Sequence, residues 1–462
     1  MITSSAMSLF AIKNGLNQAA PYLTIALVYL ASSLPGMGAL YLAFSLVGLI
    51  YWTYKKKDQL VLLLFLLGSS FSYTSLSIWN NGVVPGLPFL LLVILLLIGR
   101  VRIAIGPLLI TLLCAVVFFV HSLGKIYEVG ISPVIVDLLV VSSIPLAALR
   151  FRRLSEYNFI LAFSVCALIT LLKMAVFAYL GVENPVLSTY NDAKFLDTFD
   201  ELIGFYFLFV LMLVATPNQL RWVAVCLFGV LTFHYVSSDV WLGYYGVGSQ
   251  VLLMLIFFIV FILVRFPICF GAIVGATLIL APIMATFWDD HGDLKLQQLR
   301  SVFEILGHGD IALLPHSVHV RLAEMKTFSD LAWTHKFFGG GLGGYINLSS
   351  DFPGILGPDD YSENQLISGK IVTPHNLGYL IIKFGYVGVV LAFLFLARIY
   401  LVARKMTSIK FALYMTLGLF LILNLGYTLK ISLLLGVLWS LLTNYRRLEE
   451  DGVSEHFNRN SS

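Results

Sequence analysis

Residues 373–388 read TPHNLGYLIIKFGYVG, and they open an apolar run that continues to residue 397. About 20 apolar residues are enough for a helix to cross the hydrocarbon core of a bilayer, so the run predicts a membrane-spanning helix over 374–397. The composition agrees, because 59% of the 462 residues are hydrophobic and only 12% are charged. With a mean hydropathy of +0.90, the chain is typical of a polytopic membrane protein and not of a soluble domain.

Further apolar runs of this kind predict an all-α fold of about 14 transmembrane helices, eleven within 1–286 and three within 374–444. The range is 12–14, because the last two runs could form one broken hairpin and boundaries are soft by about 2–4 residues. The expected spans are 20–34, 37–53, 59–78, 84–99, 103–121, 132–149, 157–181, 200–215, 221–236, 247–264, 267–286, 374–397, 410–427 and 430–444.

Basic residues cluster at every second boundary between these runs, as at 55–57, 150–153 and 446–447. The short loops of the other side hold only Lys125 and Lys194. Cytoplasmic loops of membrane proteins carry this excess of Lys and Arg. The pattern therefore predicts that both termini, including the tail 445–462, are cytoplasmic.

One connecting segment, residues 287–373, is long and hydrophilic, with eleven Asp and Glu against six Lys and Arg. The charge pattern assigns this loop to the extracytoplasmic side, and such long loops usually carry function. Helical spacing of apolar residues predicts short helices over 294–306 and 317–332. Arg321 falls in the apolar stripe of the second one, where a guanidinium needs an anionic partner. That partner is either Glu324, as an ordinary helix pair, or a phosphate, which fits the planar fork of arginine.

The same loop contains two further motifs. Residues 338–345, FGGGLGGY, can offer backbone N–H groups to an anion or a sugar, with Gly340, Gly341 and Gly343 as candidates. A flexible turn is the alternative. The ring of Tyr345 can pack against a sugar or belong to the interfacial aromatic belt. Residues 288–293, WDDHGD, have a spacing that can hold Mg²⁺ on a diphosphate, but a solvated acidic loop is the interpretation we favour, and we expect neither metal nor cofactor.

His375 stands in the first turn of the expected helix 374–397, after the N-cap candidate Thr373. A helix N-terminus attracts anions and disfavours imidazolium, so His375 should stay neutral and able to accept a proton. A neutral base beside an anion site at the outer membrane face suits glycosyl transfer from a lipid diphosphate. The alternative is that His375 only anchors the helix at the interface.

Taken together, Arg321, the turn FFGGGLGGY and the stretch TPHNLGYLIIKFGYVG resemble the C-terminal signature of the O-antigen ligase/polymerase superfamily. The resemblance covers about residues 317–400. It implies a GT-C-like membrane fold in a bacterial inner membrane and a metal-independent, inverting transfer of undecaprenyl-diphosphate-linked glycans at the periplasmic face. On the matching positions, His375 would be the base that deprotonates the acceptor hydroxyl, with Asn376 beside it, and Arg321 would hold the donor diphosphate.

The chain departs from this signature in two ways. The spacing from His375 to Gly385 is one residue shorter than the commoner pattern. The periplasmic turn that often carries a second arginine corresponds here to residues 236–248, which contain Asp239 and no arginine. Lys173, inside an expected span, is a candidate for the missing cation, because a lysine in the membrane needs a function or a partner. That partner could be Asp137. Arg300 and Lys336 are further candidates.

Three functions are compatible with these residues. The favoured one is an O-antigen polymerase that joins undecaprenyl-diphosphate-linked oligosaccharide repeat units, with a chain-length regulator protein as a further partner. The second is an O-antigen ligase that transfers the glycan to lipid A-core, and the third is a polysaccharide or lipid transporter. Besides the glycan-lipid the partner is the lipid bilayer, and no nucleic acid is expected.

Overall fold

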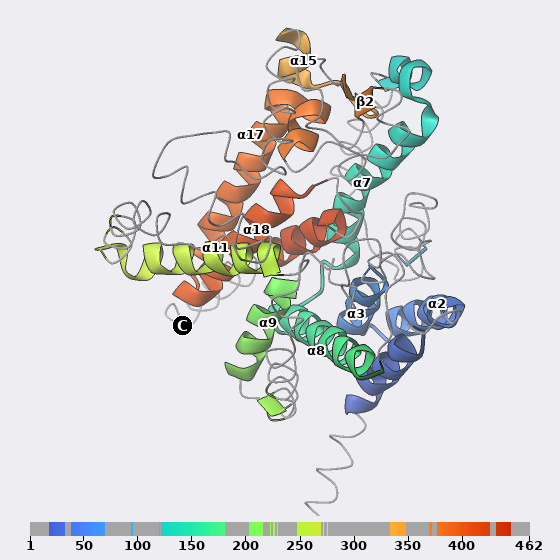
Figure 1. The fold of residues 1–462 in the computed structure, drawn as a ribbon, viewed down its shortest axis with the longest axis vertical. Coiled ribbons are helices and arrows are strands. Elements are labelled where there is room, and N and C mark those ends of the chain that lie inside the picture. Colours follow the sequence, from blue (N-terminus) through green and yellow to red (C-terminus); the bar gives the residue numbers. More distant parts are fainter. Residues whose placement is uncertain are drawn as a thin grey trace, which may run out of the picture. The chain divides into compact units, whose positions relative to one another are not determined.

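The computed structural model describes a mostly helical chain (Figure 1). The described residues are 18–32, 38–69, 94–95, 120, 122–180, 203–215, 222, 225–226, 229, 247–268, 271, 275, 333–347, 369–371, 377–425 and 431–444. Strand structure among them is confined to one antiparallel pair of two-residue strands, β1 (Ile346–Asn347) and β2 (Lys370–Ile371). The expected all-α class therefore holds for these residues apart from this pair.

The described helices coincide with many of the spans expected from hydropathy. They are Gln18–Ser32, α2 (Gly38–Tyr54), α3 (Asp58–Ser69), α7 (Ile131–Arg150), α8 (Glu156–Leu180), α9 (Ile203–Ala215), α11 (Val247–Arg265), α17 (Leu377–Ala403), α18 (Ser408–Leu423) and Ile431–Asn444. The expected spans 84–99, 103–121, 221–236 and 267–286 lie largely outside the described residues, as do both expected loop helices. The count of fourteen therefore stays a prediction.

Two of the described helical segments are long and apolar enough to cross a membrane, namely Ile131–Arg150 and Gly378–Ala403. The second of them also exposes apolar side chains, because Val390, Leu391, Phe393 and Leu394 are each more than half exposed. An apolar face of this kind is unfavourable in water and favourable against lipid. These features support a membrane protein, while the membrane and the side of the termini stay predictions.

The chain forms two compact units, of which the first consists of Met1–Val101 and Arg150–Val251. In it, α2 and α3 form a helical hairpin joined at residues 55–57. Arg150 stabilises this turn, because its guanidinium donates hydrogen bonds to Asp58 Oδ1 at 2.8 Å and to Thr53 Oγ1 at 2.9 Å. Helices α8 and α9 pack through aromatic rings, with the Phe163 and Phe209 centroids 4.5 Å apart.

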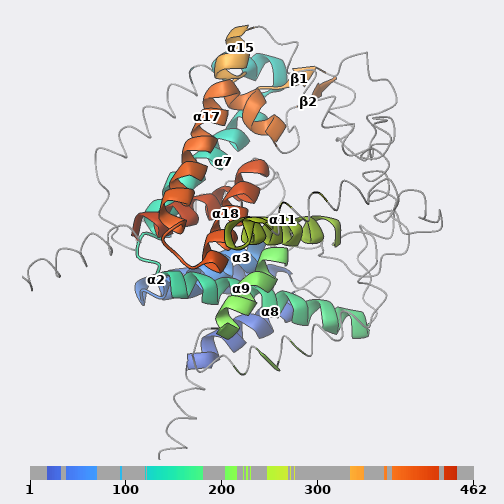
Figure 2. The same cartoon turned by 90° about the vertical axis from the view of Figure 1, so that its left-hand side faces the viewer.

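The second unit, Arg102–Leu149 and Leu252–Ser462, carries α7, α17 and α18. Figures 1 and 2 show α7 alongside α17, with the short helix α15 (Trp333–Phe338) and the two strands at the same end. Glycines allow close helix contacts in this unit, because a Cβ on Gly436 would collide with the Ile144 carbonyl of α7 and one on Gly418 with Ile399 of α17. Small residues serve the same purpose between helices in membranes.

Helix α17 is broken at Gly385, whose backbone angles are φ 60° and ψ −151°. Side chains other than hydrogen are strongly disfavoured there. The space is also closed, because a Cβ on Gly385 would lie 2.5 Å from the Lys336 carbonyl oxygen and 2.6 Å from the Gly339 nitrogen. The end of α15 thus rests directly on the break, and the expected span 374–397 consists of two helical segments in its described part.

Three glycine-to-alanine substitutions separate these effects. Gly124, in the helix 122–129, has an ordinary φ and open space around its Cβ position, so alanine should stabilise by about 0.5–1 kcal/mol. Gly130 has φ +83° and open space, so alanine should cost about 1–2 kcal/mol from backbone strain alone. Gly385→Ala should cost more than Gly130→Ala, because strain and collision add.

The free energy of unfolding of the detergent-solubilised variants, followed by tryptophan fluorescence, measures this order. If Gly385→Ala lowers the free energy of unfolding no more than Gly130→Ala does, then α15 does not rest on the break.

Candidate functional site

The glycine-rich turn 339–344 connects α15 to β1 and lies against the break in α17. Because the helix is interrupted at Gly385, the carbonyl groups of Ile382 and Lys383 can accept hydrogen bonds from outside the helix. They accept them from the turn: the Gly340 N–H donates to Ile382 O at 2.7 Å and the Gly341 N–H to Lys383 O at 3.1 Å. The turn and the helix break therefore complete each other's backbone hydrogen bonding.

Three further N–H groups of this turn are also used inside the protein. The Leu342 N–H donates to Ser122 Oγ at 2.8 Å, the Gly343 N–H to Asp137 Oδ2 at 2.6 Å, and the Gly344 N–H to Gly341 O at 2.9 Å. The prediction that Gly340, Gly341 and Gly343 offer N–H groups to a substrate is therefore wrong for these groups. The glycines serve close packing instead, since a Cβ on Gly343 would lie 2.5 Å from Val134 Cγ2.

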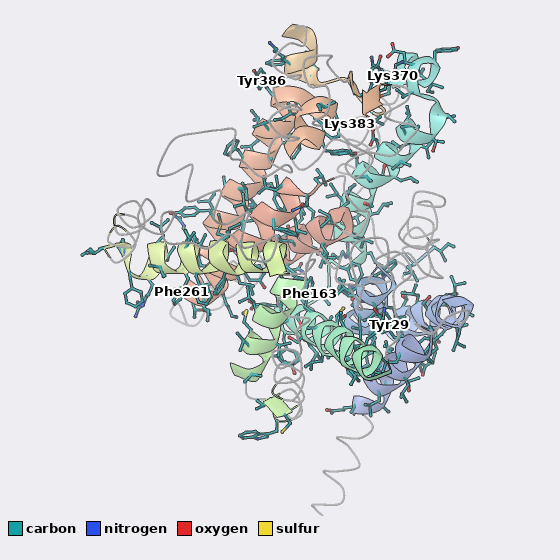
Figure 3. All side chains as sticks on the ribbon, viewed as in Figure 1. Tyr29, Phe163, Phe261, Lys370, Lys383 and Tyr386 are labelled. Atoms are coloured by element: carbon teal, nitrogen blue, oxygen red, sulfur yellow. The ribbon has the colours of Figure 1, made fainter. Side chains whose placement is uncertain are left out.

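Asp137 of α7 is the central polar side chain of this arrangement. It is 3% exposed, and besides the Gly343 N–H it contacts two side chains of α17. Tyr379 donates its hydroxyl hydrogen to Asp137 Oδ1 at 2.8 Å, and Lys383 Nζ forms an ion pair with Asp137 Oδ2 at 2.6 Å. Tyr379 and Lys383 are four residues apart, so a helix presents them on one face. Figure 3 shows Lys383 on the side of α17 toward α7 and Tyr386 on the opposite side.

Buried charges are tolerated when they are paired and hydrogen-bonded, and costly otherwise. Lys383 is fully buried at 0% exposure and Tyr379 is 2% exposed, so the carboxylate of Asp137 has no bulk water to replace its partners. Removing one partner should therefore disturb the whole contact. The arrangement joins α7, the glycine-rich turn and the first segment of α17 at one point.

A second polar cluster surrounds Tyr345, just after the glycine-rich turn. The ammonium groups of Lys125 and Lys370 lie 5.1 Å and 4.9 Å from the centroid of its ring. Lys125 also pairs with the Glu128 carboxylate at 3.0 Å, and Lys370 donates to the Glu128 carbonyl oxygen at 2.9 Å. Two cations over this ring compete with a sugar for its faces, so the stacking role predicted for Tyr345 requires them to move.

The cluster shifts two ionisation equilibria. A hydrogen bond from the Tyr345 hydroxyl, followed by one from Lys125, lowers the pKa of the Glu128 carboxyl below its usual value. The same hydrogen bond to the Glu128 carboxylate raises the pKa of the Tyr345 phenol above its usual value. The cluster is therefore held in the form with a carboxylate and a neutral phenol across the neutral pH range.

The other residues expected in the site are only partly covered by the structure. His375, Asn376, Arg321 and Arg300 lie outside the described residues, as do residues 288–293. Lys336 is half-buried on α15. The backbone carbonyl oxygen of Lys336 lies close to Gly385 in α17. Lys173 is 4% exposed on α8, and its ammonium lies 5.2 Å from the centroid of the Tyr29 ring.

The ion partner that the structure shows for Asp137 is Lys383 of α17, and the suggested pairing of Lys173 with Asp137 stays a prediction. Both residues of the actual pair carry a sequence signal, since each is a charged residue inside an apolar run. What the sequence does not contain is their pairing, because more than two hundred residues separate them. Ser122 carried no signal, since its hydroxyl meets the turn only through the tertiary fold.

No family model, no curated protein and no solved structure matches this chain.

The Ser122 hydroxyl can be tested against a matched serine. Ser122→Ala should lower the free energy of unfolding by about 1–3 kcal/mol, because it leaves the buried Leu342 N–H without an acceptor. Ser142→Ala, on α7, removes a hydroxyl that donates to the carbonyl of its own helix at Leu138, so it should be nearly neutral. Equal losses in thermal unfolding of the two variants would contradict a role for Ser122 in holding the turn.

The Tyr345 cluster should make stability depend on pH. Because the folded-state pKa of Glu128 is lowered, its contribution is present above the ordinary value near 4.5 and is lost as the pH falls through the lowered pKa. Because the pKa of Tyr345 is raised, the phenol contributes below its ordinary value near 10 and less above it.

The unfolding midpoint of Tyr345→Phe should accordingly lie below wild type between about pH 5 and pH 9, and the gap should shrink toward acid as Glu128 protonates. Tyr127→Phe removes a hydroxyl from a residue that is 94% exposed and should match wild type at each pH. A gap that is constant down to pH 3 would exclude the hydrogen bond to Glu128 as its cause.

Proposed function

We propose that this protein is a membrane glycosyltransferase that polymerises undecaprenyl-diphosphate-linked oligosaccharide repeat units at the periplasmic face of a bacterial inner membrane. In this proposal both termini are cytoplasmic, His375 is the base and Arg321 holds the donor diphosphate. The reaction is inverting and needs no metal, and chain length can be set by a separate regulator protein.

The observation that supports this proposal is the union of two motif segments. The glycine-rich segment 338–345 and the segment 373–388 are distant in sequence, yet the Gly340 and Gly341 N–H groups bond to the Ile382 and Lys383 carbonyl oxygens. Helix α17 begins at Leu377, two residues after His375. The motif that carries the resemblance is therefore one structural unit in its described part, and its glycines hold that unit together.

The chemistry assigned to this unit is self-consistent. A diphosphate is a good leaving group, so a cation that stabilises its developing charge can replace a general acid. The acceptor hydroxyl loses its proton to the neutral imidazole of His375 while the glycosidic bond to the diphosphate breaks. Attack from the face opposite the leaving group inverts the anomeric centre.

The test uses purified protein in detergent with a synthetic undecaprenyl-diphosphate oligosaccharide, and products are read by gel and mass spectrometry. Wild type should give a ladder of repeat units that persists in a chelator. His375→Ala should lose at least about 100-fold in rate, as expected for removal of a general base, and Arg321→Ala should also collapse the ladder. His316→Ala and Lys326→Ala remove a histidine and a cation from the loop 287–373 and serve as controls for His375→Ala and Arg321→Ala.

The outcomes distinguish the related activities. A ladder that survives His375→Ala would make the histidine an anchor and remove it from the mechanism. Transfer that occurs only when lipid A-core is supplied would favour an O-antigen ligase.

One observation favours a transporter as the second candidate. A helix broken inside an apolar span, with a buried charge pair beside the break, is a common way to build a transport site. Gly385 and the Asp137–Lys383 pair have this form. Sealed proteoliposomes loaded with a labelled glycan-lipid decide between the two, because a transporter moves the intact molecule across the bilayer and forms no new glycosidic bond.

A further inference from the structure

The buried side chain of Asp137 makes polar contacts both to the glycine-rich turn and to α17. Oδ1 takes the Tyr379 hydroxyl, and Oδ2 takes the Gly343 N–H together with the Lys383 ammonium. Nothing in the proposed reaction uses this carboxylate directly. Asp137 is also far from His375 in the sequence.

The position of these bonds along α17 gives them a specific consequence. Tyr379 is in the first turn of α17 and Lys383 in the second, and the break follows at Gly385. The helix is therefore interrupted between the short segment 377–384 and the regular helix that follows. The orientation of this segment depends on the contacts that its own side chains and carbonyl groups make. Asp137 contacts two side chains of this segment, those of Tyr379 and Lys383. The glycine-rich turn, which also bonds to Asp137, donates to the segment's carbonyl groups at Ile382 and Lys383.

We propose that Asp137 is a positioning residue that locks the first segment of α17 to the glycine-rich turn and thereby sets the place of His375 for proton transfer. This inference rests on the proposed function. Asp137 touches neither the substrate nor the reacting atoms. Its effect reaches the reaction through Tyr379, Lys383 and the start of α17.

Two properties of the carboxylate can be separated by substitution. Its charge balances Lys383, and its oxygens accept hydrogen from Gly343 and Tyr379. Asp137→Asn keeps the shape and an acceptor but leaves the buried ammonium of Lys383 unpaired. Lys383→Met leaves the carboxylate unpaired. The double variant Asp137→Asn/Lys383→Met is neutral and retains hydrogen-bonding groups, whereas Asp137→Leu/Lys383→Met is neutral and retains none.

The experiment measures the unfolding midpoint, kcat and KM of these four variants in full-length protein with the undecaprenyl-diphosphate oligosaccharide. Both single variants should lower the midpoint and reduce kcat by about 10–100-fold, the loss expected from a small misplacement of a catalytic group. KM should change much less, because binding contacts are not removed. The Asn/Met double variant should recover most of the midpoint and of kcat, and the Leu/Met double variant should recover neither.

The Asp58–Arg150 ion pair provides the matched control. It also involves α7, through the last residue of the helix, and it is a close pair at 2.8 Å with Arg150 buried. Asp58→Asn should lower the midpoint, while the folded protein keeps the kcat of wild type. A loss of kcat as large as that of Asp137→Asn would show general destabilisation and overturn the positioning role.

The remaining outcomes also decide the proposal. If Asp137→Asn keeps the wild-type kcat in the folded fraction, Asp137 is structural only. If the Leu/Met variant recovers as well as the Asn/Met variant, the hydrogen bonds to Gly343 and Tyr379 do not position the segment. If wild type forms no product, the proposed function fails and the positioning role fails with it, while the midpoints still report whether Asp137 and Lys383 are coupled.

Discussion

The contact on which the described part of the second unit depends is the buried carboxylate of Asp137. A charge inside an apolar helix is unfavourable, and it persists here because Lys383, Tyr379 and the Gly343 N–H surround it. Those three groups come from two segments other than α7. Satisfying one charge therefore fixes the relative position of three parts of the chain, and the glycines of the turn allow the close approach that this requires.

The helix break at Gly385 depends on the same assembly. A break in an apolar helix exposes carbonyl groups, which are costly away from water unless something else donates to them. The turn at Gly340 and Gly341 donates to two of them. Without the turn, the carbonyl groups of Ile382 and Lys383 would lack these hydrogen-bond donors. Without the break, the N–H groups of Gly340 and Gly341 would lack these acceptors. This reciprocity explains why so many glycines lie in these two short segments.

Much of this fold could be predicted from the sequence, and the reason is the length and purity of the apolar runs. The helices 131–150 and 156–180 agree closely with the expected spans 132–149 and 157–181, because the length of an apolar run sets such elements. Helix α17 continues to Ala403, beyond the expected end at 397. The break at Gly385 was not predicted, since one glycine in an apolar run does not by itself distinguish a kink from a straight helix. The strand pair was missed because two-residue strands have no periodicity to detect.

The site could be predicted only in outline. The glycine-rich sequence indicates a special turn and predicts that its N–H groups bind a ligand, whereas they bond to Ile382, Lys383, Ser122 and Asp137. A run of glycines shows that backbone approaches something closely and does not show what that is. Similarly, the apolar context marks Asp137 and Lys173 as unusual, but pairing among buried charges depends on helix packing, which no single sequence contains.

The pair of strands β1 and β2 encloses a segment of the chain, and this pairing affects how freely the sequence of that segment can vary. Because Ile346 and Asn347 pair with Ile371 and Lys370, the two ends of the segment between the strands are held side by side. The cost of closing such a loop grows only slowly with its length. The segment can therefore lengthen, shorten or change composition without shifting the strand pair, the glycine-rich turn or α17, so that its sequence is free to vary while its two ends stay fixed.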